Sequence, residues 1–149
     1  MTDVSNTFDQ ETGHSELKRE EIEIIEADIE VHEIGPAIFA EIRQQDGVSN
    51  QALINSLDLK MNRAQAFSAG EASGKSGSFF FFSHDNKFII KTMKDDELKL
   101  FIKMLPEYFV HLKTYKYSLL ARFYGVYKVQ MEDVSAVSLV IMANTAQVY

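Results

Sequence analysis

Two short apolar runs joined by a polar tetrapeptide constrain the fold of this chain more than any other feature. The runs are SFFFF, residues 78–82, and KFIIKTM, residues 87–93, and the tetrapeptide between them is SHDN. Phenylalanine and isoleucine favour strands, and Asp85 followed by Asn86 is typical of a tight turn. The sequence therefore predicts a β-hairpin, with the four phenylalanines in the core of a sheet.

A segment rich in glycine and serine precedes this hairpin. It contains Gly74, Lys75 and Ser76, which match the end of the phosphate-binding P-loop pattern G-x-x-x-x-G-K-[ST]. The first glycine of that pattern falls on Ala69. A P-loop also lies between a buried strand and a helix, whereas this segment leads into a predicted strand. Both the pattern and its context therefore argue against a P-loop.

A second design for binding phosphates has the opposite context. Kinases place a glycine-rich loop over the ATP phosphates at the edge of an antiparallel sheet, and a lysine on a following strand pairs with those phosphates. Lys91 is the matching candidate, because it lies on an otherwise apolar strand after the glycine-rich segment. The spacing is equally compatible with a lysine that alternates outward from a half-buried strand, and glycine-rich segments are often plain linkers.

The whole chain predicts an α+β fold, an antiparallel sheet with helices on one side. We expect a disordered tail over 1–15, an acidic helical segment over 16–60 and a sheet with a helix over 61–149. The first helix of the acidic segment is expected to begin near Ser15 and to include Ile29, although Ile22 and Ile24 also fit the period of a strand.

Further local signals place the other elements before the hairpin. Pro36 suits the first position of a helix that Asp46 and Gly47 would end. Ser49 or Asn50 can cap a short helix that follows. Residues 60–78 predict a loop by composition.

A helix and two strands are expected after the hairpin. Asp95 or Asp96 would cap the helix, and Pro106 would kink or divide it. The runs at 122–130 and 136–143 read as strands.

Charge and composition limit the function classes. The chain has 149 residues, no cysteine and a net charge of −7, divided as −10 over 1–60 and +3 over 61–149. The absence of cysteine excludes disulfides and thiolate zinc sites, and the four scattered histidines have no metal-ligand spacing. An acidic chain without an arginine-rich patch predicts no nucleic-acid partner. No apolar run is long enough to cross a bilayer, so any membrane contact is expected to be peripheral.

Several dispersed blocks together resemble one protein family, the phosphatidylinositol phosphate kinases, over about residues 28–144. Their form is most similar to the phosphatidylinositol 4-phosphate 5-kinases, and an upstream stretch, EIGPAIFAEIRQQDGVSNQALINSL, resembles the helical segment before the kinase lobe. The blocks are NRAQAF, GKSGSFFFFSHDNKFIIKTM, MLPEYFVHLKTYKYSLLARFYGVYKV and VIMAN.

The resemblance implies the N-terminal lobe of a lipid kinase with the SAICAR synthase-like fold. Such an enzyme would transfer the ATP γ-phosphate, with Mg²⁺, to an inositol-ring hydroxyl of phosphatidylinositol 4-phosphate at the cytoplasmic face of a membrane. The resemblance assigns the phosphate loop to Gly74, Ser76, Gly77 and Ser78. It makes Lys91 the ATP-binding lysine and places the linker to the second lobe, near the adenine, at Val140, Ile141, Met142 and Asn144.

The sequence departs from the family pattern in two places. TAQVY follows Asn144, where the family has an aromatic residue shortly downstream, so the adenine contacts of the family are carried over only as far as Asn144. The family's DLKGS stretch, its catalytic aspartate and its Mg²⁺-binding aspartate have no counterpart in these 149 residues. We therefore expect no catalytic residue in this chain and no kinase activity without the C-terminal lobe. We also expect exposed apolar surface where the second lobe would dock, which favours self-association such as a homodimer.

Lys99 and Lys103 are four residues apart on the predicted helix and share one face. They are candidates for a basic surface that meets an anionic phosphoinositide membrane, although an ordinary solvated helix face has the same pattern. A different class of function, a non-catalytic interaction or dimerisation module with a kinase-like lobe, is the alternative to the enzyme. The parent reading frame discriminates the two, because an enzyme requires a downstream DLKGS-like stretch.

Overall fold

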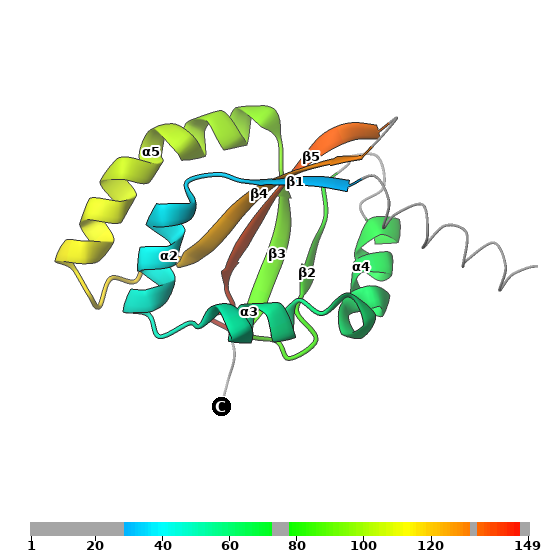
Figure 1. Ribbon diagram of the computed structural model, residues 1–149, viewed down its shortest axis with the longest axis horizontal. Coiled ribbons are helices and arrows are strands. Elements are labelled where there is room, and N and C mark those ends of the chain that lie inside the picture. Colours follow the sequence, from blue (N-terminus) through cyan, green and yellow to red (C-terminus); the bar gives the residue numbers. More distant parts are fainter. Residues whose placement is uncertain (1–28, 73–77, 132–133, 147–149) are drawn as a thin grey trace, which may run out of the picture.

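The computed structural model describes residues 29–72, 78–131 and 134–146. In this part of the chain, five strands form one sheet and four helices lie around it (Figure 1). The elements are, in order, β1 (Ile29–Glu33), α2 (Pro36–Gln45), α3 (Asn50–Ser56), α4 (Leu59–Ala72), β2 (Phe80–Phe82), β3 (Phe88–Met93), α5 (Asp95–Thr114), β4 (Phe123–Met131) and β5 (Val134–Ala143).

The sheet has the strand order β1-β4-β5-β3-β2, and every neighbouring pair is antiparallel. The predicted hairpin is present as β2 and β3, and the two predicted C-terminal strands are present as β4 and β5. The α+β class with an antiparallel sheet is thus confirmed. β4 and β5 are paired over the greatest length, from the pair Phe123–Met142 to the pair Met131–Val134, with two register shifts along β4.

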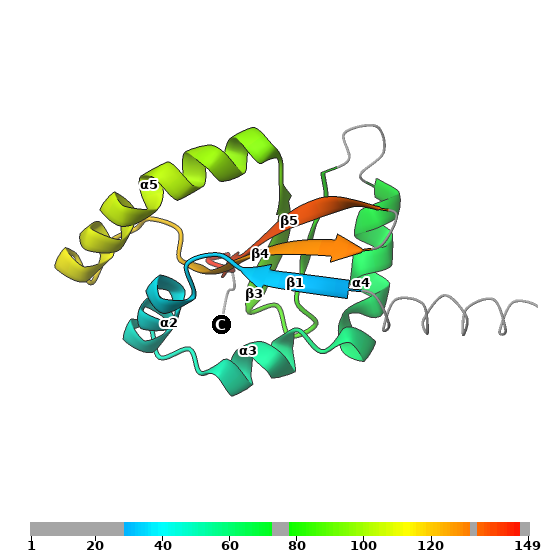
Figure 2. The ribbon, with the colours of Figure 1, turned by 45° about the horizontal axis from the view of Figure 1, so that its top comes forward.

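Aromatic side chains hold α2 and α5 against the sheet. The Phe101 ring of α5 lies 4.9 Å from the Phe123 ring of β4, edge to face, and 6.4 Å from the Phe39 ring of α2. Figures 1 and 2 show α2 and α5 together at one side, whereas α4 lies beside β2 at the other. The buried apolar side chains are Phe39, Ile42, Leu53, Phe88, Ile90, Phe101, Leu105, Tyr108, Leu112, Tyr124, Val126, Val140 and Ile141.

The expected starts and ends of the two short helices are present. Pro36 occupies the first turn of α2, and Gly47, with φ 72°, follows its C-cap at Asp46. The Ser49 hydroxyl accepts a hydrogen bond from the backbone N–H of Ala52, at 3.1 Å, and so caps α3.

The prediction of a loop over 60–78 is wrong for most of its length, because α4 occupies Leu59–Ala72. The segment LKMNRAQAFSAGEA consists mainly of good helix formers, and the Asp58 carboxylate accepts a hydrogen bond from the Met61 N–H, at 3.0 Å. The glycines and serines that suggested a loop are concentrated after Ala72, where the helix ends. The composition of residues 73–78 therefore does not extend back into α4.

The prediction of a helix from Ser15 through Ile29 is also wrong at its C-terminal end. Residues Ile29–Glu33 form the edge strand β1, which pairs with β4 from Ile29–Met131 to Glu33–Tyr127. The isoleucine and glutamate pattern of this region fits both the helical and the strand period, and pairing with β4 decides between them. The rest of that expected helix, and the tail over 1–15, lie outside the described residues.

α5 is one helix in which Pro106 is an interior residue, so the predicted division is wrong. Proline removes one backbone hydrogen bond from a helix. Buried side chains on both sides of it, Leu105 and Tyr108, anchor the two halves in the core. The N-cap is Lys94, and Asp95 and Asp96 lie in the first turn, where negative charge complements the helix dipole.

Candidate functional site

Lys91 lies in the middle of β3, between Phe80 of β2 and Val140 of β5. Residues directly opposite each other in antiparallel strands point to the same face of the sheet. Met142 is opposite Ile89, two residues before Lys91, and so points to this face as well. The structure thus brings three predicted site residues together on one face, where the Lys91 side chain is 45 % exposed and Val140 is buried.

An acidic partner from α5 faces this lysine. The Lys91 ammonium lies 3.5 Å from the Glu97 carboxylate, which also accepts a hydrogen bond from the Lys94 N–H, at 2.8 Å. That backbone hydrogen bond, followed by the charge of Lys91, lowers the pKa of Glu97. Sequence reasoning missed Glu97, although an acid at the third position of a helix is a typical capping signal.

Two exposed phenylalanines accompany Lys91 on the same face. Phe80 and Phe82 are 58 % and 39 % exposed, and their rings lie 6.1 Å apart, edge to face. The prediction that the whole phenylalanine run is sheet core is therefore wrong. Phe81, on the opposite face, packs against the core. The alternation is the ordinary period of a strand, which four identical residues conceal in the sequence.

The start of β2 is tied to the residue after Lys91. The Phe79 N–H donates to the Thr92 hydroxyl, at 2.9 Å, and the Thr92 N–H donates to the Phe79 carbonyl, at 3.0 Å. Thr92 is buried and was also missed in the sequence. Ser78 is half-buried next to this contact. The remaining predicted phosphate-loop residues, Gly74, Ser76 and Gly77, lie outside the described residues.

Asn144 lies beyond the end of β5, away from Lys91 along the strand. Its side-chain amide donates to the Asn86 carbonyl, at 2.7 Å, and its backbone N–H donates to the Lys87 carbonyl, at 2.9 Å. These contacts hold the residue after β5 on the turn between β2 and β3.

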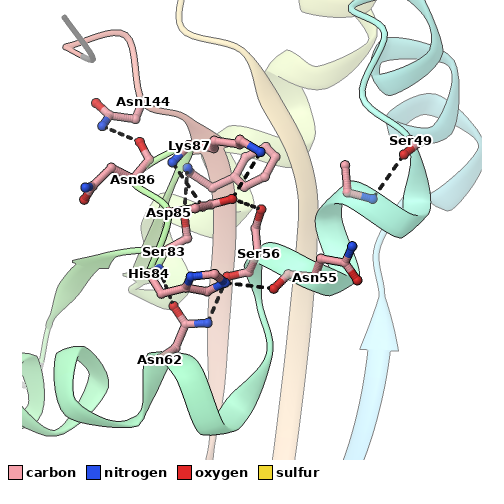
Figure 3. A network of polar contacts seen from close by, with 12 residues as sticks. Ser49, Asn55, Ser56, Asn62, Ser83, His84, Asp85, Asn86, Lys87 and Asn144 are labelled. Atoms are coloured by element: carbon pink, nitrogen blue, oxygen red, sulfur yellow. Dashed lines mark hydrogen bonds and ion pairs between the residues drawn. The ribbon is translucent and has the colours of Figure 1, made fainter. Parts of the chain in front are cut away.

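A polar network surrounds that turn, and sequence reasoning missed it (Figure 3). The Asp85 carboxylate accepts hydrogen bonds from the hydroxyls of Ser56 and Ser83, at 2.6 and 2.7 Å, and lies 3.4 Å from the Lys87 ammonium. Burial alone would raise the pKa of Asp85, but these hydrogen bonds together hold the pKa well below its ordinary value. His84 bonds to the Asn55 carbonyl and not to Ser83 or Asp85, so the turn contains no catalytic triad.

The predicted basic pair lies on the outside of α5. Lys99 is exposed and forms an ion pair with Asp96, at 3.7 Å, and Lys103 is also exposed. Over residues 29–72, 78–131 and 134–146, no group of three acidic or histidine side chains could hold a metal ion. No helix in the same ranges is long and apolar enough to cross a membrane.

Comparison with known proteins identifies the family. The model of the family described as phosphatidylinositol-4-phosphate 5-kinase matches residues 61–148. A phosphatidylinositol 4-phosphate 5-kinase 8 of Arabidopsis thaliana is 44 % identical over 71 residues, which are 48 % of this chain and 9 % of the relative. A probable phosphatidylinositol phosphate kinase of Dictyostelium discoideum is 42 % identical over 110 residues, 73 % of this chain and 15 % of the relative.

A third relative, the phosphatidylinositol 4-phosphate 5-kinase its3 of Schizosaccharomyces pombe, is 32 % identical over 117 residues, 78 % of this chain and 15 % of the relative. The chain thus spans 9 % to 15 % of the length of these three relatives. The family model covers more than half of the chain, from α4 to the end of β5. The chain therefore belongs to the phosphatidylinositol-4-phosphate 5-kinase family.

Proposed function

We propose that this chain supplies the ATP-binding side of a lipid kinase that transfers the γ-phosphate to the inositol ring of phosphatidylinositol 4-phosphate. The observation that supports this most is Lys91, whose side chain is 45 % exposed and is held by Glu97 of the neighbouring helix. A lysine on the third strand paired with a helix glutamate is the arrangement that kinases use to orient ATP phosphates.

Each residue of this face has a role in the proposal. Lys91 would bind the phosphates, and Glu97 would hold the ammonium in place when no phosphate is bound. Gly74, Ser76, Gly77 and Ser78 would cover the phosphates with backbone N–H groups. Val140 and Met142 would lie near the adenine, and Asn144 would lead into the second lobe.

The described residues do not fit a Mg²⁺ site. Mg²⁺ requires oxygen ligands in octahedral geometry, and the carboxylate beside Lys91, Glu97, is already bound to the lysine and to the N-cap of α5. The proposal therefore assigns the metal and the catalytic base to the C-terminal lobe of the family, whose DLKGS stretch has no counterpart in residues 1–149. Residues 1–149 alone are thus expected to have no turnover.

The proposed substrate lies in an anionic membrane. Lys99 and Lys103 project from α5 into solvent and would contribute favourable charge at such a surface. The protein would act as a peripheral protein at the cytoplasmic face.

Phosphoryl transfer to vesicles that contain phosphatidylinositol 4-phosphate tests the proposal. Protein expressed from the full reading frame is expected to phosphorylate the lipid with Mg²⁺ and ATP, and residues 1–149 alone are not. Turnover by residues 1–149 would contradict the division of the site between two lobes. No transfer by the full reading frame would contradict the kinase and favour a non-catalytic interaction module.

A further inference from the structure

The α5–β4 segment, residues 115–122, turns large apolar side chains into solvent. Tyr117 is 89 % exposed, Leu119 is fully exposed and Leu120 is 52 % exposed. Tyr115, at the C-cap of α5, adds a further exposed ring. Figures 1 and 2 both show this segment at the end of the molecule where α5 ends. Apolar side chains gathered in this way on a surface mark a contact with a partner.

Hydrogen bonds from the inner side hold the α5–β4 segment in place. The Ser118 hydroxyl bonds to the His111 ring, at 2.8 Å, and accepts from the Leu120 N–H, at 3.3 Å. The Tyr108 hydroxyl donates to the Ala121 carbonyl, at 2.7 Å. The exposed side chains are thus presented by an ordered segment, so a partner that binds them has little ordering cost.

The chain leaves the sheet beside this segment. Ala143, the last residue of β5, donates its N–H to the Arg122 carbonyl, at 2.8 Å. Leu119 is only three residues before Arg122, so its Cα lies within about 11 Å of the Cα of Arg122. The polypeptide beyond β5 therefore begins next to the exposed apolar side chains.

Charge distinguishes a protein partner from a membrane at this place. Three basic residues lie in the segment or beside it, and two of them are neutralised: Lys113 pairs with Glu41, and Arg122 with Asp46, at 3.4 Å. In the described part of the chain, Lys116 alone remains without an acidic partner. An anionic membrane attracts clusters of free basic residues, whereas a nearly neutral apolar surface suits another apolar protein surface.

We propose that the α5–β4 segment is the docking surface for the C-terminal lobe of the same polypeptide, with Tyr117 and Leu119 buried at the centre of an apolar contact. The match covers only 9 % to 15 % of the three relatives, so they contain ample polypeptide for such a lobe. The inference rests on the proposed division of the kinase between two lobes.

Hydroxyl-radical footprinting of protein from the full reading frame, without lipid, tests the contact. The reference is the oxidation rate of the same side chains after unfolding in urea. We expect Tyr117 and Leu119 to be oxidised about tenfold more slowly in the folded protein than in the reference. Leu100 is the matched control, because it is 69 % exposed on α5 and lies about 20 Å from the segment along the helix. Its rate should differ from the reference less than about twofold.

The variants Leu119→Glu and Leu100→Glu provide a second measurement on the same protein. Neither side chain is buried in the described structure, so neither change disturbs the core of this lobe. Leu119→Glu should lower Tm by about 4 °C or more, because it places a charge in an apolar contact. Leu100→Glu should leave Tm unchanged.

Rapid oxidation of Tyr117, or equal Tm in the two variants, would overturn the inference. Protection that disappears on about hundredfold dilution would assign the surface to a second copy instead. Protection that appears only with anionic vesicles would assign it to a membrane. Neither measurement needs turnover, so protection in a protein that transfers no phosphate contradicts only the proposed function. Phosphate transfer with unprotected Tyr117 contradicts only this inference.

Discussion

The ion pair between Lys91 and Glu97 joins the middle of β3 to the first turn of α5. The two side chains are 45 % and 48 % exposed, and exposed pairs of this kind contribute about 0–1 kcal/mol to stability. The pair therefore matters more for the direction of the ammonium than for folding. Lys91 could be proposed from the sequence because the strand period places it, whereas Glu97 could not, because its contact depends on how α5 leaves the sheet.

The depressed pKa of Asp85 predicts that the stability of the fold depends on pH. Its pKa in the folded protein is depressed, so the ionised carboxylate stabilises the fold above the ordinary value of about 3.9 for an unfolded chain. That contribution is lost as pH falls through the acid range towards the folded pKa. The difference in Tm between the parent and Asp85→Asn should therefore be large at pH 7 and shrink from about pH 5 to pH 2.

The control for this titration is Glu107→Gln, at an exposed carboxylate in the interior of α5. Its Tm should follow the parent curve at every pH. Parallel curves for the parent and Asp85→Asn would show that the depressed pKa of Asp85 is not linked to folding.

The hairpin of β2 and β3 is the element on which the site depends. Its two apolar runs and the Asp-Asn turn are visible in the sequence, because strand propensity and turn chemistry are local. The helix α4 and the strand β1 were not predicted correctly, since the first was obscured by adjacent glycines and the second depends on pairing with β4. The turn network was missed because its partners are 29 residues apart, Ser56 and Asp85.

Thr92→Val tests how the hairpin holds the start of β2. Valine keeps the shape of threonine but removes the hydroxyl that accepts from the Phe79 N–H, in a residue only 4 % exposed. We expect the free energy of unfolding in urea to fall by about 1–2 kcal/mol. KM for ATP should also rise, because Phe79 follows the glycine-rich segment. Thr114→Val, at an exposed position on the last turn of α5, should change neither value.

The exposed lysines of α5 predict binding to an anionic membrane surface. Lys99→Glu with Lys103→Glu reverses two exposed charges, and each basic residue near an anionic surface contributes about 1 kcal/mol. We expect binding to vesicles with anionic lipid to weaken at least tenfold, measured by sedimentation. Lys60→Glu, a charge reversal on α4, is the comparison that should have little effect. Binding that is equal in all three proteins would refute a basic membrane surface on α5.

At the scale of the molecule, the described residues form an antiparallel sheet with helices around it, and the Lys91 face of this sheet is only partly covered. Phe80 and Phe82 remain exposed there, whereas the Phe101 ring of α5 packs against Phe123 of β4. Exposed aromatic side chains around a lysine are suited to contact a bound nucleotide or a second lobe. The family model begins in α4 and continues through the sheet to residue 148, so the same elements carry both the family signal and the candidate site.

The dissociation constant of ATP for protein from the full reading frame, with and without Lys91→Met, tests this account most directly. We predict that the parent binds ATP with Mg²⁺ and that Lys91→Met weakens binding about tenfold or more, because a charged hydrogen bond contributes about 1.5–3 kcal/mol. Tm should stay unchanged, and Lys99→Met should bind like the parent. Equal affinity in the parent and Lys91→Met would contradict the claim that this face of the sheet binds the ATP phosphates.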